Sequence, residues 1–163
     1  MQKAILLLPS LMILLFSLES CAQESKEIPI NNHSYEVEKS EDEWKEQLND
    51  LEYKVLRGEG TEQAFTGKYV DWKKQGTFNC KACGNPLFAS ETKFKSGTGW
   101  PSFYEPLEGK SVLERSDTQY GWNRIEIECN RCGSHLGHVF DDGPKPTGLR
   151  YCINSVCLDF KEK

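Results

Sequence analysis

Two Cys-x-x-Cys pairs, Cys80/Cys83 and Cys129/Cys132, are the part of this sequence with the clearest chemical capacity. Each pair can present two sulfur atoms from a tight turn, and a glycine follows each pair directly. Four thiolates at this spacing can complete a tetrahedral zinc site. The sequence therefore predicts one structural zinc per chain, which joins two hairpins far apart in the sequence. The alternative is two disulfides, because oxidising compartments favour them.

Another cysteine, Cys152, stands apart from both pairs in the segment Arg150-Tyr151-Cys152-Ile153-Asn154-Ser155. A cysteine is a nucleophile only as a thiolate, so its usual pKa of about 8.5 must be offset by positive charge or hydrogen-bond donors. Residues two apart on a strand share one face, so Arg150 and Asn154 are expected to flank the sulfur. For this cysteine alone, the alternative is a buried and inert thiol.

Two further segments favour chemistry at Cys152. Residues 97–103, Gly-Thr-Gly-Trp-Pro-Ser-Phe, place a rigid aromatic between glycines and a proline, as in loops that present a binding surface. Residues 135–140, His-Leu-Gly-His-Val-Phe, supply two imidazoles. Four sulfurs saturate a zinc ion, so these histidines are available for other work. The remaining tryptophans are expected in the core: Trp44, Trp72 and Trp122.

The elements that must position these residues are short. Ser40 and Glu43 form a capping-box signature that opens a helix through Leu48, and residues 49–52 give a similar signal for a second helix. Gly58 is expected to end that helix in a left-handed conformation. From residue 77 onward, Gly, Pro, Asn and Asp interrupt the chain at short intervals, which is typical of an all-β domain.

Two segments of that domain are predicted as strands. Residues 124–128 alternate between apolar and charged side chains and run into Cys129, which indicates a half-buried strand. Residues 151–160 end with apolar side chains at alternate positions, Val156, Leu158 and Phe160, which indicates a closing strand. We therefore expect a mainly β fold with a helical N-terminal layer.

The N-terminus predicts export. Residues 1–20 combine Lys3 with a short apolar run, which fits a signal peptide, and Leu-Glu-Ser-Cys at 18–21 resembles a lipobox with Cys21 as the lipidated residue. Residues 21–39 are expected to form a tether, and residues 40–163 the folded domain. This predicts a protein of the cell envelope, anchored to a membrane and facing the periplasm. We also expect a monomer. The alternatives are cleavage near Ala22, giving a soluble exported protein, and retention as a membrane helix.

The charge of the chain disfavours nucleic-acid binding. It carries 25 Asp and Glu against 20 Lys and Arg, and it has no Lys/Arg-rich block. A zinc-ribbon protein that contacts nucleic acid is therefore possible on cysteine spacing but poorly supported by electrostatics. A module that recognises methionine-rich or oxidised segments without turnover is a second alternative to an enzyme.

The motifs together resemble a known family. Residues 99–103, 135–140, 142–144 and 150–155, in this order and with both cysteine pairs, resemble the B type of peptide-methionine sulfoxide reductases (MsrB). The resemblance implies two antiparallel sheets with peripheral helices and a structural zinc held by four cysteines. It also implies reduction of the R epimer of methionine sulfoxide in oxidised proteins, with electrons from a thioredoxin-like thiol donor.

The resemblance also implies residue roles. Cys152 would attack the sulfoxide sulfur and become a sulfenic acid, while His138 and His135 would hold and protonate the oxygen. Trp100, together with Phe140, would bind the substrate. Arg150 and Asn154 would orient the centre and favour the thiolate. Asp142 would tune the histidines.

The sequence departs from the family at one position. Thr98 stands where many members carry a resolving cysteine, and threonine cannot form a disulfide. Cys157 is a candidate substitute, but in an extended strand it would lie about 16 Å from Cys152 on the opposite face. We therefore expect an external thiol to reduce the sulfenic acid directly.

Overall fold

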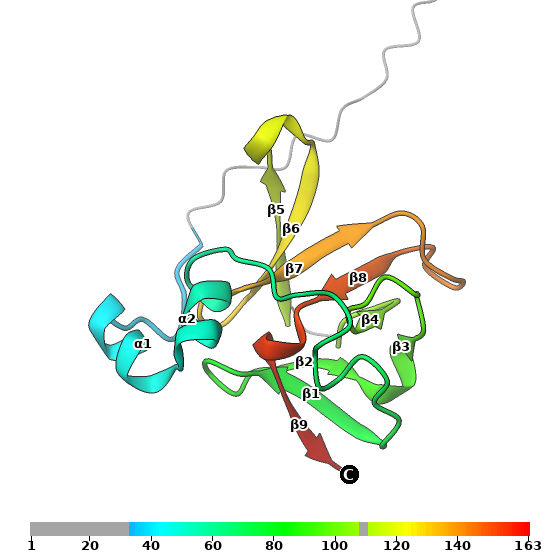
Figure 1. Cartoon of the computed structure of the whole chain (residues 1–163), viewed down its shortest axis with the longest axis horizontal. Helices are drawn as coiled ribbons and strands as arrows, with labels where there is room; N and C mark the ends of the chain where they lie inside the picture. Colours follow the sequence, from blue (N-terminus) through cyan, green and yellow to red (C-terminus); the bar gives the residue numbers. More distant parts are fainter. Residues whose placement is uncertain (1–32, 108–110) are drawn as a thin grey trace, which may run out of the picture.

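The computed structural model describes residues 33–107 and 111–163 of the chain (Figure 1). The predicted signal peptide and the lipidation site at Cys21 lie outside the described residues. In the described part of the chain, no helix is both long enough and apolar enough to cross a membrane.

The two helices, α1 (Glu41–Gln47) and α2 (Asp50–Leu56), begin as the sequence predicts. The Ser40 hydroxyl accepts from the Glu43 amide and the Glu43 carboxylate accepts from the Ser40 amide, and a second capping box opens α2. The expectation for Gly58 is wrong, because Glu59, with φ of 51°, takes the left-handed conformation. Gly58 is needed for close approach, since a Cβ there would lie 2.8 Å from the Lys54 carbonyl oxygen.

The described strands form the two antiparallel sheets that the family resemblance implies (Figure 1). The three-stranded sheet has the order β2-β1-β9, and its strands are β2 (Pro86–Ala89), β1 (Gly76–Cys80) and β9 (Leu158–Glu162). The six-stranded sheet has the order β3-β4-β8-β7-β6-β5. Its strands are β3 (Lys93–Phe94), β4 (Ser102–Phe103), β8 (Arg150–Ile153), β7 (His135–Phe140), β6 (Arg124–Cys129) and β5 (Val112–Asp117).

Aromatic side chains fill the space between the two sheets. Phe88 from the three-stranded sheet stacks on Phe103 from the six-stranded sheet, with ring centroids 4.4 Å apart. Phe78 meets the same ring edge-on at 5.1 Å. Because stacked and edge-to-face aromatic pairs add stability beyond their buried area, this contact fixes how the sheets lie on each other.

Trp122 does not lie in the core as expected, because its side chain is 69% exposed. It lies in the connection between β5 and β6, a hairpin that extends beyond the rest of the sheet (Figure 1). Trp44 is buried, and Trp72 packs partly buried against the core.

The single closing strand expected at residues 151–160 is also wrong, because the chain turns after Ile153. A short 3-10 helix, Ser155–Cys157, separates β8 from β9 and carries the chain from one sheet to the other. The amides of Ser155 and Val156 donate to the carboxylate of Glu62 instead of to a neighbouring strand. A contact with a residue far away in the sequence therefore ends the strand.

Residues 33–39, which the sequence assigned to the tether, pack on the domain at the turn between β6 and β7. The Val37 amide donates to the Arg131 carbonyl at 2.9 Å, and the Tyr35 hydroxyl donates to Glu128 at 2.7 Å. The Tyr35 ring lies against Gly133, where a Cβ would be 2.6 Å from it. The folded part of the chain thus begins before residue 40.

Candidate active site and metal centre

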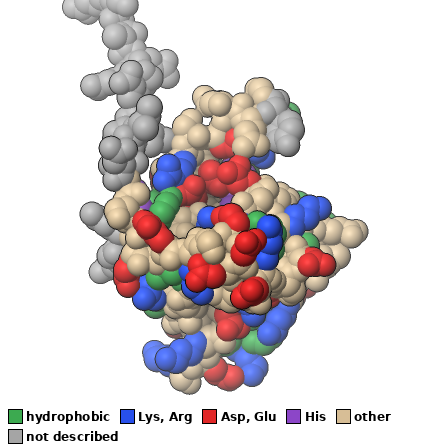
Figure 2. Space-filling view, turned by 90° about the vertical axis from the view of Figure 1, so that its left-hand side faces the viewer, with side chains coloured by type: hydrophobic (Ala, Val, Ile, Leu, Met, Phe, Trp, Pro, Cys, Tyr) green, Lys and Arg blue, Asp and Glu red, His purple; other side chains and the backbone are tan. Residues whose placement is uncertain are grey.

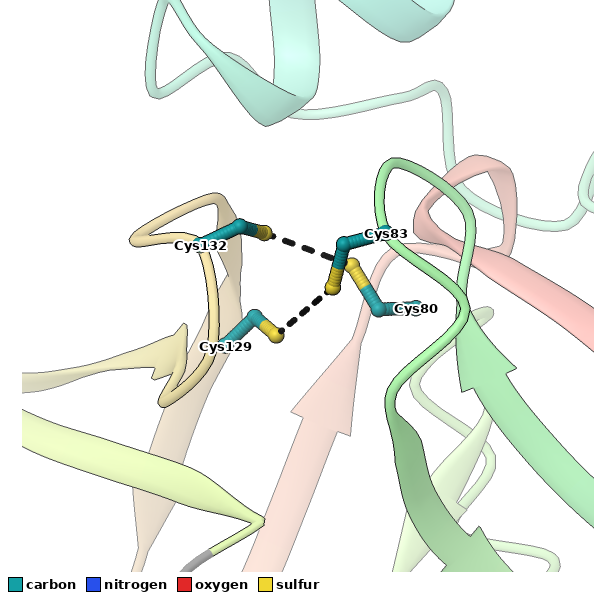
Figure 3. Close-up of side chains that lie close together, drawn as sticks. All are labelled: Cys80, Cys83, Cys129 and Cys132. Atoms are coloured by element: carbon teal, nitrogen blue, oxygen red, sulfur yellow. Dashed lines mark hydrogen bonds between the residues drawn. The ribbon is translucent and has the colours of Figure 1, made fainter. Parts of the chain in front are cut away.

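The four paired cysteines meet at one point between the sheets (Figure 3). Their sulfur atoms all lie within 4.8 Å of one another, with Cys80 to Cys132 at 3.9 Å and Cys83 to Cys129 at 3.6 Å. A tetrahedral zinc ion with Zn–S bonds of about 2.3 Å requires sulfurs about 3.8 Å apart. The sulfurs therefore fit the predicted structural zinc, and they are too far apart for the alternative disulfides.

The metal centre joins one hairpin from each sheet. Cys80 and Cys83 lie at the turn between β1 and β2, and Cys129 and Cys132 lie at the turn between β6 and β7. The glycines after each pair have φ of 75° and 68°, so the two turns need residues without a Cβ. Zinc, held by these thiolates, would fasten the two sheets together at the edge where the hairpins meet.

Cys152 lies in the middle of the six-stranded sheet, on β8. It is directly opposite Ser102 on β4 and His138 on β7. Residues directly opposite each other in antiparallel strands share one face of the sheet, so all three side chains lie on the same side. Cys152 is half-buried, so it is not sealed in the core.

A row of hydroxyl groups ends at Cys152. The Thr98 Oγ1 atom lies 3.8 Å from the sulfur, and it lies 2.8 Å from the Ser96 hydroxyl. Ser102 donates to the Ser96 hydroxyl at 2.8 Å. At the position of the missing resolving cysteine, the chain therefore offers a hydrogen-bonding group to Cys152.

The electrostatics of Cys152 differ from the sequence-based expectation. Burial raises the pKa of the thiol above its ordinary value, while the hydrogen bond from Thr98 and the charge of Arg150 oppose this shift. The resting thiol is therefore protonated at neutral pH. Ionisation of Cys152 must accompany the chemistry rather than precede it.

Arg150 is held by Asp142 and not by the histidines. Its Nε and Nη2 atoms donate to the two Asp142 carboxylate oxygens at 2.7 and 2.9 Å, and its guanidinium lies 4.3 Å from the centre of the Phe140 ring. This pairing lowers the pKa of the Asp142 carboxyl and raises the pKa of Arg150. Asp142, which the sequence assigned to the histidines, therefore orients the arginine beside Cys152.

Asn154 does not flank the sulfur. The strand ends at Ile153, so the expected alternation of side chains does not extend to Asn154. Its side chain is buried, with the amide nitrogen donating to the Leu136 carbonyl and the oxygen accepting from the Glu62 amide. Asn154 therefore fixes the turn that follows Cys152.

The two histidines lie together, each with a carboxylate. His138 is 2.9 Å from Asp117, His135 is 2.5 Å from Glu126, and their ring centroids are 5.6 Å apart. Burial lowers the pKa of His138, and Asp117 opposes this shift. The His138 imidazole is therefore neutral at pH 7.

A cavity of about 490 Å³ opens onto both rings. Acidic side chains gather on the face of the molecule that Figure 2 presents, with histidine partly visible among them. The residues that line the cavity are Gly58, Glu59, Gly60, Thr61, Asp117, Gln119, Arg124, Glu126, His135 and His138.

Glu62 connects the parts of the site, although nothing in the sequence pointed to it. Its carbonyl accepts from the Trp100 indole at 3.2 Å, and its buried carboxylate accepts from the Ser155 and Val156 amides at 2.5 and 3.0 Å. Burial raises the pKa of this carboxyl, although both amides oppose the shift. One residue thus positions the indole and the turn after Cys152.

Cys157 lies outside this site. Its side chain is completely buried, and its sulfur donates to the His135 carbonyl at 3.4 Å. Burial raises the pKa of this thiol well above its ordinary value. The separation expected for an extended strand does not apply, because the chain turns between Cys152 and Cys157, but burial keeps the thiol protonated and away from solvent.

The part of the chain that matches known proteins includes every residue of this site. The family model of the SelR domain matches residues 48–162. The chain is 59% identical over 125 residues to a peptide methionine sulfoxide reductase MsrB from Methanosarcina barkeri, covering 77% of the chain and 88% of the relative. Proteins of the same name from Pseudomonas putida W619 and Leptospira interrogans are 55% and 52% identical, covering 78% and 80% of the chain and 96% and 99% of the relatives.

Proposed function

The chain belongs to the SelR domain family, and from this membership we propose that it reduces methionine-R-sulfoxide in oxidised proteins to methionine. It is an oxidoreductase that acts on sulfur groups. The structural observation that carries the proposal is a partly exposed Cys152 paired in register with His138. An epimer-resolved assay with a methionine sulfoxide peptide and dithiothreitol tests it, and turnover of the S epimer alone would contradict it.

The protonation states support a balanced reaction. Cys152 forms a bond to the sulfoxide sulfur, and its proton passes through the His138–His135 pair to the sulfoxide oxygen. The sulfur–oxygen bond and the new bond between the two sulfurs then break as the hydroxyl group moves to the Cys152 sulfur, so Cys152 becomes a sulfenic acid and methionine leaves as the reduced product. Because the thiol starts protonated and the imidazole neutral, no proton is needed from outside the site.

The remaining side chains support this step by holding its participants. Trp100, fixed by Glu62, would pack against the methyl group of the substrate, and Phe140 would line the same site. Arg150, fixed by Asp142, would stabilise the thiolate as it forms. Cys80, Cys83, Cys129 and Cys132 would hold a zinc ion with four thiolates, so its role would be structural and not chemical.

The pH dependence of kcat/KM follows from the two shifted groups. The reaction needs a protonated Cys152 thiol and a neutral His138 imidazole. Activity therefore falls at pH values below the pKa of His138 and at pH values above the pKa of Cys152. The pKa of His138 is lowered from 6.5 and the pKa of Cys152 is raised from 9.0. We therefore expect kcat/KM to be constant at least between pH 6.5 and pH 9.0. In Asp117→Asn, loss of the charge that raises the pKa of His138 shifts the acid limb to lower pH. An acid limb above pH 7 in the wild type would contradict this assignment.

We further propose that an external thiol donor reduces the Cys152 sulfenic acid directly, because Thr98 cannot form a disulfide and Cys157 is buried. In Thr98→Cys, the 3.8 Å separation between Oγ1 and the Cys152 sulfur predicts an intramolecular disulfide after one turnover. Mass spectrometry should detect the loss of two thiols in this variant and a single oxidised cysteine in the wild type. The control Cys157→Ser should keep its activity, and a stoichiometric Cys152–Cys157 disulfide in the wild type would contradict direct reduction.

For the location, we propose an exported monomer that is anchored to a membrane through a lipid on Cys21 and faces the periplasm. The support is the lipobox-like segment at residues 18–21. The protein substrates would then be oxidised proteins of the cell envelope. Detergent-phase partitioning of the full-length chain tests the anchor, and recovery in the aqueous phase would contradict it.

A further inference from the structure

Phe65 is an aromatic residue that the fold exposes at a conformational cost. Its side chain is 72% exposed, and its φ of 67° places it in the left-handed region. Bulky side chains rarely adopt this region, because the Cβ approaches the backbone closely. Burial of the ring would normally offset such strain, but this ring is largely in solvent. The strained backbone conformation therefore holds the Phe65 ring at the surface and not in the core.

The contacts that hold Phe65 belong to the substrate site. Its amide donates to the Gly99 carbonyl at 2.8 Å. A Cβ at Gly99 would lie 2.9 Å from the Phe65 nitrogen and 3.0 Å from a ring carbon, so glycine at this position lets the ring come close. The next residue, Trp100, is fixed by Glu62. Phe65 is thus held against Gly99, the residue that directly precedes Trp100, whose indole is proposed to bind the substrate methyl group.

The surroundings of Phe65 indicate what it contacts. Within residues 61–67, Glu62 is the charged residue, and it is buried under the surface. The exposed residues near Phe65 in the sequence, Gln63 and Thr66, are uncharged, and the next exposed charge along the chain is Lys68. Such a surface suits an apolar stretch of polypeptide and offers no ion pair to a charged one.

We propose that Phe65 contacts the polypeptide on one side of the oxidised methionine, where it binds an apolar side chain and favours protein substrates over free methionine sulfoxide. The proposal rests on the proposed function and names its specificity. Free methionine sulfoxide has no neighbouring side chain, so it can use Trp100 but gains nothing from Phe65. An aromatic that is already held in place loses little conformational entropy on binding.

The test compares Phe65→Ala with the wild type on two substrates. We expect KM for a peptide with apolar residues beside methionine-R-sulfoxide to rise about tenfold, which is the size expected for partial burial of an aromatic ring. The kcat for the peptide, and both constants for free methionine-R-sulfoxide, should not change. The matched control is Leu51→Ala, an exposed apolar residue on α2 at 49% exposure, which should leave both substrates unaffected.

A second variant separates contact from folding. Phe65→Gly should melt at a higher temperature, because glycine adopts a φ of 67° without strain, while its KM for the peptide rises as in Phe65→Ala. Structural damage would lower the melting temperature. Phe65→Tyr keeps the aromatic ring, so its KM for the peptide should equal that of the wild type.

Several results would overturn the inference. An equal loss on the peptide and on free methionine sulfoxide would mean that Phe65 acts only through the Trp100 site. An unchanged KM for the peptide would mean that the ring does not touch it. A wild-type chain that reduces neither substrate would instead overturn the proposed function on which the inference rests.

Discussion

Cys152→Ser should lower kcat for a methionine-R-sulfoxide peptide at least about ten-thousandfold, as expected for loss of a nucleophile. A serine hydroxyl is much harder to ionise than a thiol, and, unlike the cysteine sulfur, it cannot accept the sulfoxide oxygen to form a sulfenic acid. Because Cys152 is paired on both sides by β4 and β7, and oxygen is smaller than sulfur, the fold should not change. Single-turnover assays with dithiothreitol measure the loss, and thermal unfolding checks the fold.

The control for this result is Cys157→Ser, which removes the other described cysteine that lies outside the metal centre. It should retain turnover, although its burial makes some loss of stability expected. If Cys152→Ser kept more than a few per cent of the wild-type rate, another group would be the nucleophile.

Cys132→Ser should have the largest effect on stability. It replaces one of the four sulfurs that lie within 4.8 Å of one another, so the zinc content should fall from about one per chain towards zero. Structural zinc supplies about 10–16 kcal/mol of folding free energy, which is comparable with the whole stability of a domain. We therefore expect the two sheets to separate and the chain to unfold at or below about 37 °C. Elemental analysis and thermal unfolding measure both effects.

Two comparisons make the zinc result specific. Cys157→Ser changes another buried cysteine, outside the metal centre, and should keep one zinc per chain. Addition of a strong chelator to the wild type should reproduce the unfolding of Cys132→Ser. A metal-free chain with the melting temperature of the wild type would show that the four sulfurs do not carry the fold.

Features set by neighbouring residues were predictable from the sequence. The zinc ligands follow from two local spacings, and the helix starts follow from side chains three residues apart, such as Ser40 and Glu43. The half-buried strand before Cys129 follows from its alternation. In each case the signal and the structure lie within a few residues of each other.

Features set by distant partners were not predictable. Alternation placed Asn154 beside Cys152, but the strand ends because Glu62 captures the next two amides. The family resemblance implies that Asp142 tunes the histidines, yet Arg150 donates to both of its oxygens. The partner of His138 is Asp117 on β5, a strand that has no clear alternation in the sequence. These pairings depend on sheet order, which a single sequence does not state.

The attachment of residues 33–39 to the turn between β6 and β7 has a mechanical consequence. Any load on the N-terminal end of the described chain passes first into hydrogen bonds such as that from Val37 to Arg131, one residue before Cys132. The two helices follow later along the chain and are shielded from this load. A pull on that end would therefore be borne by the turn that carries Cys129 and Cys132.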